Sequence, residues 1–105
     1  MAVTSVTIWA TRPGRAIDFV ASAAQAKAIH ERLGGKVRLM QITFGGPTSQ
    51  QFVYTVEVPD MTAFAAFSDK MNGDAEWNTF WTAANNPDPT ATLVSQSLLT
   101  DLRGF

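Results

Sequence analysis

The chain has 105 residues, enough for one domain with a two-layer hydrophobic core, and a formal net charge of −1 without any basic run. It therefore lacks the electrostatic attraction that dominates nucleic-acid binding. Because there is no cysteine and only one histidine, disulfides, thiolate nucleophiles, cysteine-based metal sites and multi-histidine metal sites within one chain are all excluded.

Residues 3–11 are predicted to form a strand, because β-branched residues are frequent there and the side chains alternate with period two. The strand ends at Arg12-Pro13-Gly14, since proline lacks the N–H that a strand ladder needs and glycine permits a turn. One side of the strand carries Val6, Ile8 and Ala10, and the other carries Thr7, Trp9 and Thr11.

Residues 15–33 are predicted to form a helix, since alanine, leucine, glutamine and glutamate favour that conformation. Polar residues recur on one side at helical spacing, and the opposite side carries Ala16, Val20, Ala23 and Ala24. Because alanine is small, this side can approach a sheet closely. Gly34-Gly35 ends the helix, because glycine adopts the left-handed conformation there without a Cβ penalty.

Residues 36–44 and 52–58 are predicted to be two strands of an antiparallel hairpin with a long loop. We expect a register that pairs Phe44 with Phe52, Ile42 with Tyr54 and Met40 with Val56, because all six side chains then share one strongly apolar face. The other face then carries Leu39, Gln41, Thr43, Val53, Thr55 and Glu57.

The second half of the chain predicts a broken helix followed by a last strand. Residues 61–71 form its first part, which Asn72-Gly73 interrupts, and Asp74 can cap a new helical turn. Trp77, Phe80 and Trp81 then form one stripe of a second short helix. Residues 90–102 read as a fourth strand.

The order β-α-β-β-α-β is that of α+β, ferredoxin-like folds. Right-handed crossovers put both helices on one face of a four-stranded antiparallel sheet. The apolar side that includes Val6, Ile8 and Met40 is expected to lie under the helices. The opposite, open face then carries Trp9, and burying its ring would recover roughly 1.5–3 kcal/mol or more. Three states are open for this face: solvated, bound to nucleic acid, or paired with the same face of a second chain.

Four short segments resemble those of a known group of proteins. They are residues 9–14 (WATRPG), 34–37 (GGKV), 58–61 (VPDM) and 74–77 (DAEW), the last being similar to an Asp-x-Glu-Trp segment. Over nearly its full length the chain resembles members of the dimeric α+β barrel superfamily, and more narrowly small uncharacterised bacterial proteins related to the NIPSNAP and EthD-type groups.

This resemblance implies one domain over residues 1–105 and a homodimer in which two sheets face each other and close a barrel. It implies no particular reaction, because the superfamily includes monooxygenases, cyclases, isomerases and haem-degrading enzymes. We expect no cofactor.

Two residues are candidates for acid–base catalysis. Glu57 points toward the mixed face, where a closed barrel would raise the pKa of its carboxyl and suit it to proton transfer. The alternative is a solvated or ion-paired carboxylate at a strand end. His30, in the last turn of the first helix, could be oriented by Glu57 or Asp60; the alternative is a structural or surface histidine.

Six residues are candidates for ligand binding. Trp9, Gln41, Thr43 and Thr55 could line a barrel cavity, or equally could pack in a dimer interface. Trp77 and Trp81 could form an aromatic wall at the barrel mouth, or pack against the sheet as core residues. Tyr54 is a weaker candidate, because its parity puts it under the helices.

The sequence therefore predicts a homodimer that binds a small apolar or aromatic molecule in the barrel cavity. Two alternatives stay open: a cofactor-free enzyme of monooxygenase, cyclase or isomerase type that acts on such a compound, and a non-catalytic dimerisation module. Neither a nucleic acid nor a membrane is an expected partner. Because no secretory signal and no membrane-spanning run is visible, we expect a cytoplasmic location.

Overall fold

The computed structural model describes residues 1–48 and 50–105. Along the chain the elements are β1 (Val3–Thr11), α1 (Ala16–Arg32), β2 (Lys36–Gln41), a short 3₁₀ helix (Gly46–Thr48), β3 (Phe52–Val58), α2 (Met61–Asn72), α3 (Ala75–Ala84) and β4 (Ala91–Thr100). They match the predicted elements in kind and order. The main difference is that β2 ends at Gln41, after which the chain turns and leaves Phe44 94% exposed.

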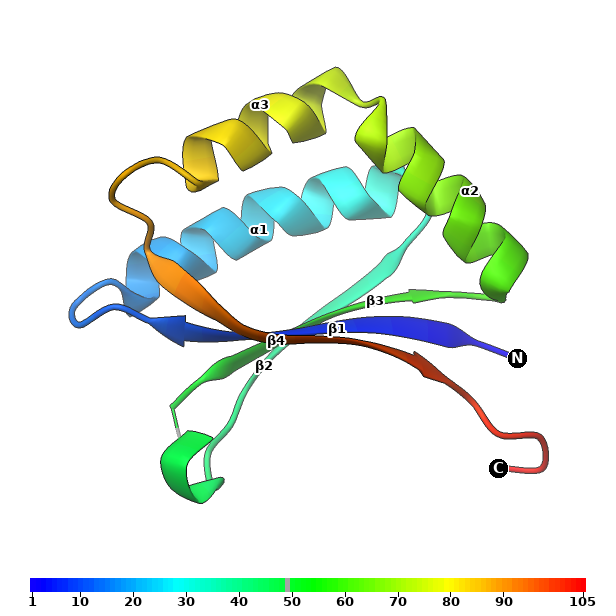
Figure 1. The fold of residues 1–105 in the computed structure, drawn as a ribbon, viewed down its shortest axis with the longest axis horizontal. Coiled ribbons are helices and arrows are strands. Elements are labelled where there is room, and N and C mark those ends of the chain that lie inside the picture. Colours follow the sequence, from blue (N-terminus) through cyan, green and yellow to red (C-terminus); the bar gives the residue numbers. More distant parts are fainter. Residues whose placement is uncertain (49) are drawn as a thin grey trace.

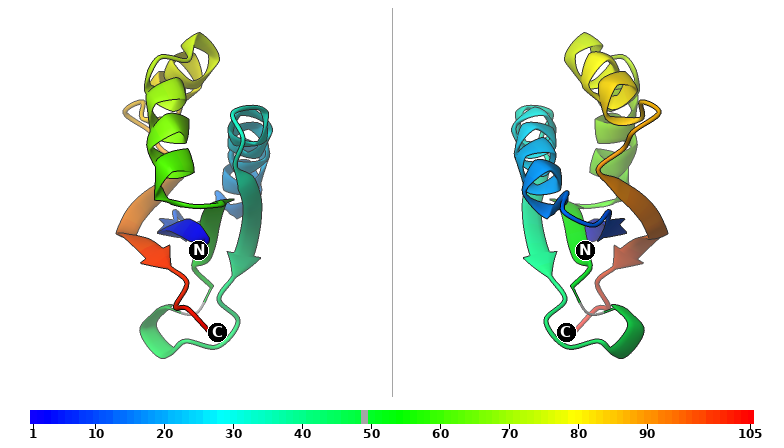
Figure 2. Two further views of the ribbon diagram at one scale, coloured as in Figure 1. Left: turned by 90° about the vertical axis from the view of Figure 1, so that its right-hand side faces the viewer. Right: turned by 90° about the vertical axis from the view of Figure 1, so that its left-hand side faces the viewer.

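The four strands form one antiparallel sheet in the order β2-β3-β1-β4. The three helices all lie on one face of this sheet, and the other face is uncovered (Figures 1 and 2). The predicted fold class, a ferredoxin-like α+β arrangement with helices on one face, is therefore confirmed.

The predicted register of the hairpin is wrong by three residues. In the structure Leu39 lies opposite Tyr54 and Val37 lies opposite Val56. Because successive side chains of a strand point to opposite faces, an odd shift turns all of β2 over. Val37 and Leu39 therefore face the helices, and Met40 lies on the open face.

The predicted orientation of β1 is also wrong. Trp9 pairs with Phe52 and Thr7 pairs with Tyr54, so both lie on the helix side of the sheet. The centroid of the Trp9 ring lies 5.9 Å from the centroid of the Phe19 ring in α1. Alternation alone does not say which side of a strand faces the helices. Here the more polar side does, because a cavity lined partly by polar groups lies beneath them.

The core forms mainly between α1 and the three strands β1, β2 and β3, and Phe67 of α2 and Ala91 of β4 complete it. The buried residues of α1 recur along one face as Phe19, Ala23, Ala26, Ile29 and His30. Of the face predicted from the alanine pattern, only Ala23 is buried, and Val20 is 42% exposed. The packed side is the one that carries Phe19, Ile29 and His30, with Ala23 and Ala26 between them.

One carboxylate, that of Asp74, sets where the second part of the broken helix begins. Asp74 accepts a hydrogen bond from the backbone N–H of Trp77 at 2.8 Å, and thereby caps α3 as predicted. The same carboxylate lies 2.8 Å from the Arg32 guanidinium at the end of α1. Asp74 therefore ties the start of α3 to α1 and sets where the aromatic stripe of α3 lies.

Candidate functional site

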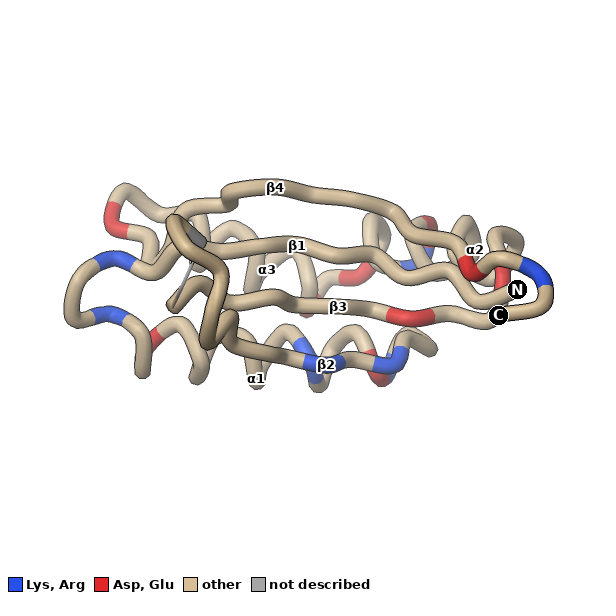
Figure 3. The backbone as a smooth tube through the Cα atoms, turned by 90° about the horizontal axis from the view of Figure 1, so that it is seen from below, with Lys and Arg blue, Asp and Glu red and all other residues tan. Residues whose placement is uncertain are grey.

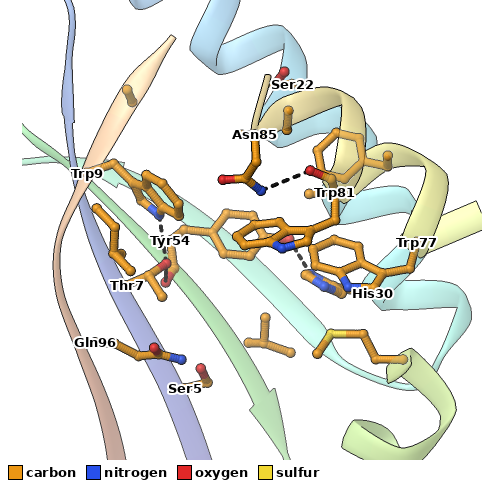
Figure 4. Close-up of a pocket in the computed structure, with 18 of the residues that line it drawn as sticks. Ser5, Thr7, Trp9, Ser22, His30, Tyr54, Trp77, Trp81, Asn85 and Gln96 are labelled. Carbon is orange, nitrogen blue, oxygen red and sulfur yellow. Dashed lines mark hydrogen bonds between the residues drawn. The ribbon is translucent and has the colours of Figure 1, made fainter. Parts of the chain in front are cut away.

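A cavity of about 530 Å³ lies between the helices and the sheet (Figure 4). Strands β1, β3 and β4 form its floor, and α1, α2 and α3 form its walls. Its lining includes Ser5, Thr7, Trp9, Phe19, Ser22, Ala26, His30, Tyr54, Phe67, Met71, Trp77, Trp81, Asn85, Leu93 and Gln96. Beside this cavity, every β4 residue after Ala91 is exposed to solvent.

One wall is a row of three rings in contact, from α1 and α3. The ring centroids of His30 and Trp77 are 4.4 Å apart. Trp77 stacks in turn on Trp81, with 5.6 Å between centroids and 20° between planes. Trp81 is 43% exposed, so the row of rings runs from the protein surface to a buried imidazole.

The inner end of this row of rings is a hydrogen-bonded pair. The Tyr54 hydroxyl lies 2.7 Å from Nδ1 of His30, and both side chains are buried. Burial lowers the pKa of His30 to about 4. Burial, together with the nearby charge of Glu31, raises the pKa of the Tyr54 phenol. Both groups are therefore neutral at pH 7.

The second ring nitrogen of His30 is buried without a partner. Among the residues that the structure describes, none forms a hydrogen bond with Nε2. A buried polar atom left unpaired costs about 1–3 kcal/mol. A protein more readily retains this free-energy cost where the unpaired atom forms a hydrogen bond with a ligand.

A second set of polar groups lies on β1, at the floor of the cavity. The indole N–H of Trp9 donates to the Thr7 hydroxyl at 2.8 Å, and that hydroxyl lies 3.4 Å from the Tyr54 carbonyl oxygen. These bonds hold the Trp9 ring in place against the helix layer.

Charged side chains are missing from the lining. None of the described residues around the cavity is Asp, Glu, Lys or Arg. Over residues 1–48 and 50–105, no group of three or more His, Asp or Glu side chains could hold a metal ion. No described helix is long and apolar enough to cross a membrane.

The structure brings four of the predicted site residues together at this cavity: Trp9, His30, Trp77 and Trp81. The other four lie elsewhere. The Gln41 amide bonds to the Gln50 side chain, and Thr43 is exposed beyond the end of β2. Thr55 and Glu57 lie on the open face of β3, Thr55 buried and Glu57 exposed.

Sequence reasoning gave too little weight to Tyr54, which it placed correctly under the helices. Four of the six ligand-binding candidates were expected on the open face, whereas the cavity lies on the helix side. One signal was present in the sequence: His30 shares a helical side with Phe19, Ala23 and Ala26, and the strand parity of Tyr54 put it under the helices. Two polar rings in one buried layer would need each other or a ligand.

The fold of this chain is similar to that of several solved structures. A NIPSNAP domain protein from Burkholderia xenovorans superposes with a TM-score of 0.75 over 100% of this chain and 98% of its own, at 15% identity. The chain has the NIPSNAP fold. A NIPSNAP family protein from Agrobacterium tumefaciens superposes with a TM-score of 0.73 over 99% and 96% of the two chains, also at 15% identity. The predicted resemblance is thereby confirmed at the level of fold.

The NIPSNAP-like fold is shared with an enzyme. SnoaB, a cofactor-independent oxygenase from Streptomyces nogalater, superposes with a TM-score of 0.67 at 18% identity, over 95% of this chain and 92% of its own. No protein-family model matches the sequence, and no curated protein matches it significantly.

Proposed function

We propose that the protein binds a small apolar or aromatic molecule in the cavity between its helices and its sheet. The observation that carries this proposal is the cavity itself. Its volume of about 530 Å³ lies in the usual range for ligand sites, and its lining combines aromatic rings with a few polar groups. This location differs from the sequence-based expectation, which put the ligand between two sheets inside a barrel.

A direct test is titration with indane and with naphthalene, two hydrocarbons of suitable size, followed by calorimetry and by NMR of the labelled protein. We expect both to bind, with shift changes concentrated at cavity residues. Ala84 lines the cavity from α3, so Ala84→Phe should fill part of it and weaken binding about 10-fold or more. Ala65, exposed on α2, gives the matched control Ala65→Phe, which should bind as the parent does.

If neither hydrocarbon bound, or if both variants bound alike, the proposal would be wrong. The alternative of a non-catalytic dimerisation module would then account better for the chain.

A second candidate function is cofactor-free catalysis on the bound compound. Two observations favour it: the likeness in fold to SnoaB, and the neutral His30–Tyr54 pair at the cavity, which could move a proton. Oxygen uptake in the presence of 1-naphthol distinguishes the two functions. Uptake that is catalytic and falls in a His30→Phe variant would favour an oxygenase, and binding without uptake would favour a binding protein.

We further propose that the protein is a homodimer through the open face of its sheet. Val6, Ile8, Met40 and Val53 form the centre of this face, and its charged residues lie only on β2 and β3 (Figure 3). The chain exposes 6784 Å², whereas a monomer of 11.4 kDa is expected to expose roughly 5800 Å². This excess, together with an apolar uncovered face, supports a second copy as the cover.

Sedimentation velocity at micromolar concentration should give the mass of a dimer. Ile8→Lys places a charge at the centre of the open face and should shift the equilibrium toward monomer by roughly 100-fold or more. Ala24→Lys, on the exposed side of α1, should leave the dimer intact. A monomeric parent protein would contradict the proposal.

A further inference from the structure

Two features of the cavity together specify the ligand more closely than its size does. The first is the absence of ionised side chains among the described lining residues. A ligand with a carboxylate or an ammonium group would lose its hydration there without gaining an opposite charge, which is strongly unfavourable. The lining therefore selects for an uncharged molecule.

The second feature is the direction of the hydrogen bond between Tyr54 and His30. A phenol O–H is a stronger donor than an imidazole N–H, and an imidazole nitrogen is a better acceptor than a phenol oxygen. The Tyr54 hydroxyl therefore donates to Nδ1 across the 2.7 Å between them. The reverse arrangement would leave the buried hydroxyl proton unpaired. In the favoured arrangement the ring proton of His30 is on Nε2.

Nε2–H is then a buried donor without an acceptor among the described residues. His30 is 6% exposed and lines the cavity, and the Trp77 ring packs against it at an interplanar angle of 40°. A planar molecule that enters next to Trp77 can place an oxygen against Nε2. Trp77 has to shift to admit it, and partly exposed Trp81 next to it leaves room for that movement.

We propose that the cavity takes an uncharged, planar molecule with a hydrogen-bond acceptor, such as an aromatic ketone, and that His30 donates from Nε2 to this acceptor. This inference rests on the proposed ligand binding in the same cavity. It assigns His30 as the residue that distinguishes among ligands of equal size, and Tyr54 as the residue that fixes its tautomer.

Three probes built on one bicyclic skeleton test it in the whole protein at pH 7: indane, 1-indanone and indane-1-carboxylate. We expect 1-indanone to bind about 3- to 10-fold more tightly than indane, as one added hydrogen bond allows. We expect the carboxylate to bind at least roughly 10-fold more weakly than the ketone. Equal affinity for ketone and hydrocarbon, or a preference for the carboxylate, would overturn the inference while leaving hydrocarbon binding, and so the proposed function, in place.

Loss of all binding, including that of indane, would instead overturn the proposed function. The double variant His30→Phe with Tyr54→Phe removes both polar partners and leaves none unpaired. It should lose the preference for 1-indanone, so that the dissociation constants of 1-indanone and indane differ by less than about 2-fold. ¹⁵N NMR of the imidazole gives a readout that needs no variant: we expect the Nε2–H tautomer, and the Nδ1–H tautomer would contradict the assignment.

Discussion

Replacing Gly35 with alanine is expected to lower the free energy of unfolding by roughly 2–3 kcal/mol. Gly35 is buried where α1 turns into β2, and a Cβ there would lie 2.5 Å from Cγ1 of Val56 and 3.2 Å from the Phe67 ring. Both neighbours belong to the core, so neither can swing away into solvent. Denaturant unfolding of the variant and the parent measures the difference.

Two further variants show whether crowding is the cause. Gly73→Ala should change the free energy of unfolding little, because a Cβ at Gly73 meets only a backbone oxygen at 3.7 Å. Val56→Ala removes the closest atom, so Gly35→Ala should cost clearly less in that background. If the cost were the same in both backgrounds, the clash with Val56 would not be its source.

Acid should destabilise the fold through His30 by up to roughly 3 kcal/mol. Burial lowers the pKa of His30 from 6.5 to about 4, so between these values the unfolded chain binds a proton that the folded chain does not. The contribution of a neutral His30 is therefore fully present above pH 6.5 and is lost as the pH falls toward 4. Unfolding by denaturant at several pH values from 7.5 to 4 measures this slope.

Carboxylates that are paired in the folded state also lose their contribution in acid. Hydrogen bonds from Arg32 and from the Trp77 N–H lower the pKa of Asp74, and a hydrogen bond from Lys27 lowers that of Glu31. The double variant His30→Phe with Tyr54→Phe keeps these carboxylates and removes the imidazole. It should show a shallower slope between pH 6.5 and 5. An identical slope in parent and variant would show that His30 is not buried as a neutral ring.

The elements and their order could be predicted from local signals. Period-two alternation marked β1 and β3, Pro59 and the glycines marked the ends of elements, and the Asp74 cap marked the start of α3. These signals depend on each residue's own backbone preferences and nearest neighbours, so they survive without knowledge of the rest of the chain.

Which face of each strand is buried could not be predicted in the same way. The expected pairing of Met40 with Val56 maximised apolar contact, but the real pairing of Val37 with Val56 leaves Met40 on the open face. The rule that the more apolar side faces the helices assumes a solid core. Here a cavity with polar groups replaces part of that core, and so Thr7 and Trp9 lie beneath the helices. The position of the cavity on the helix side of the sheet was missed for the same reason.

The sequence contains three tryptophans, and all three, Trp9, Trp77 and Trp81, line the same cavity. The intrinsic indole fluorescence of the whole protein therefore originates at that one place. Its emission maximum and its quenching by added solutes will report on the cavity without a dye, a label or an engineered reporter. Libraries of unmodified compounds can thus be screened optically against the native chain.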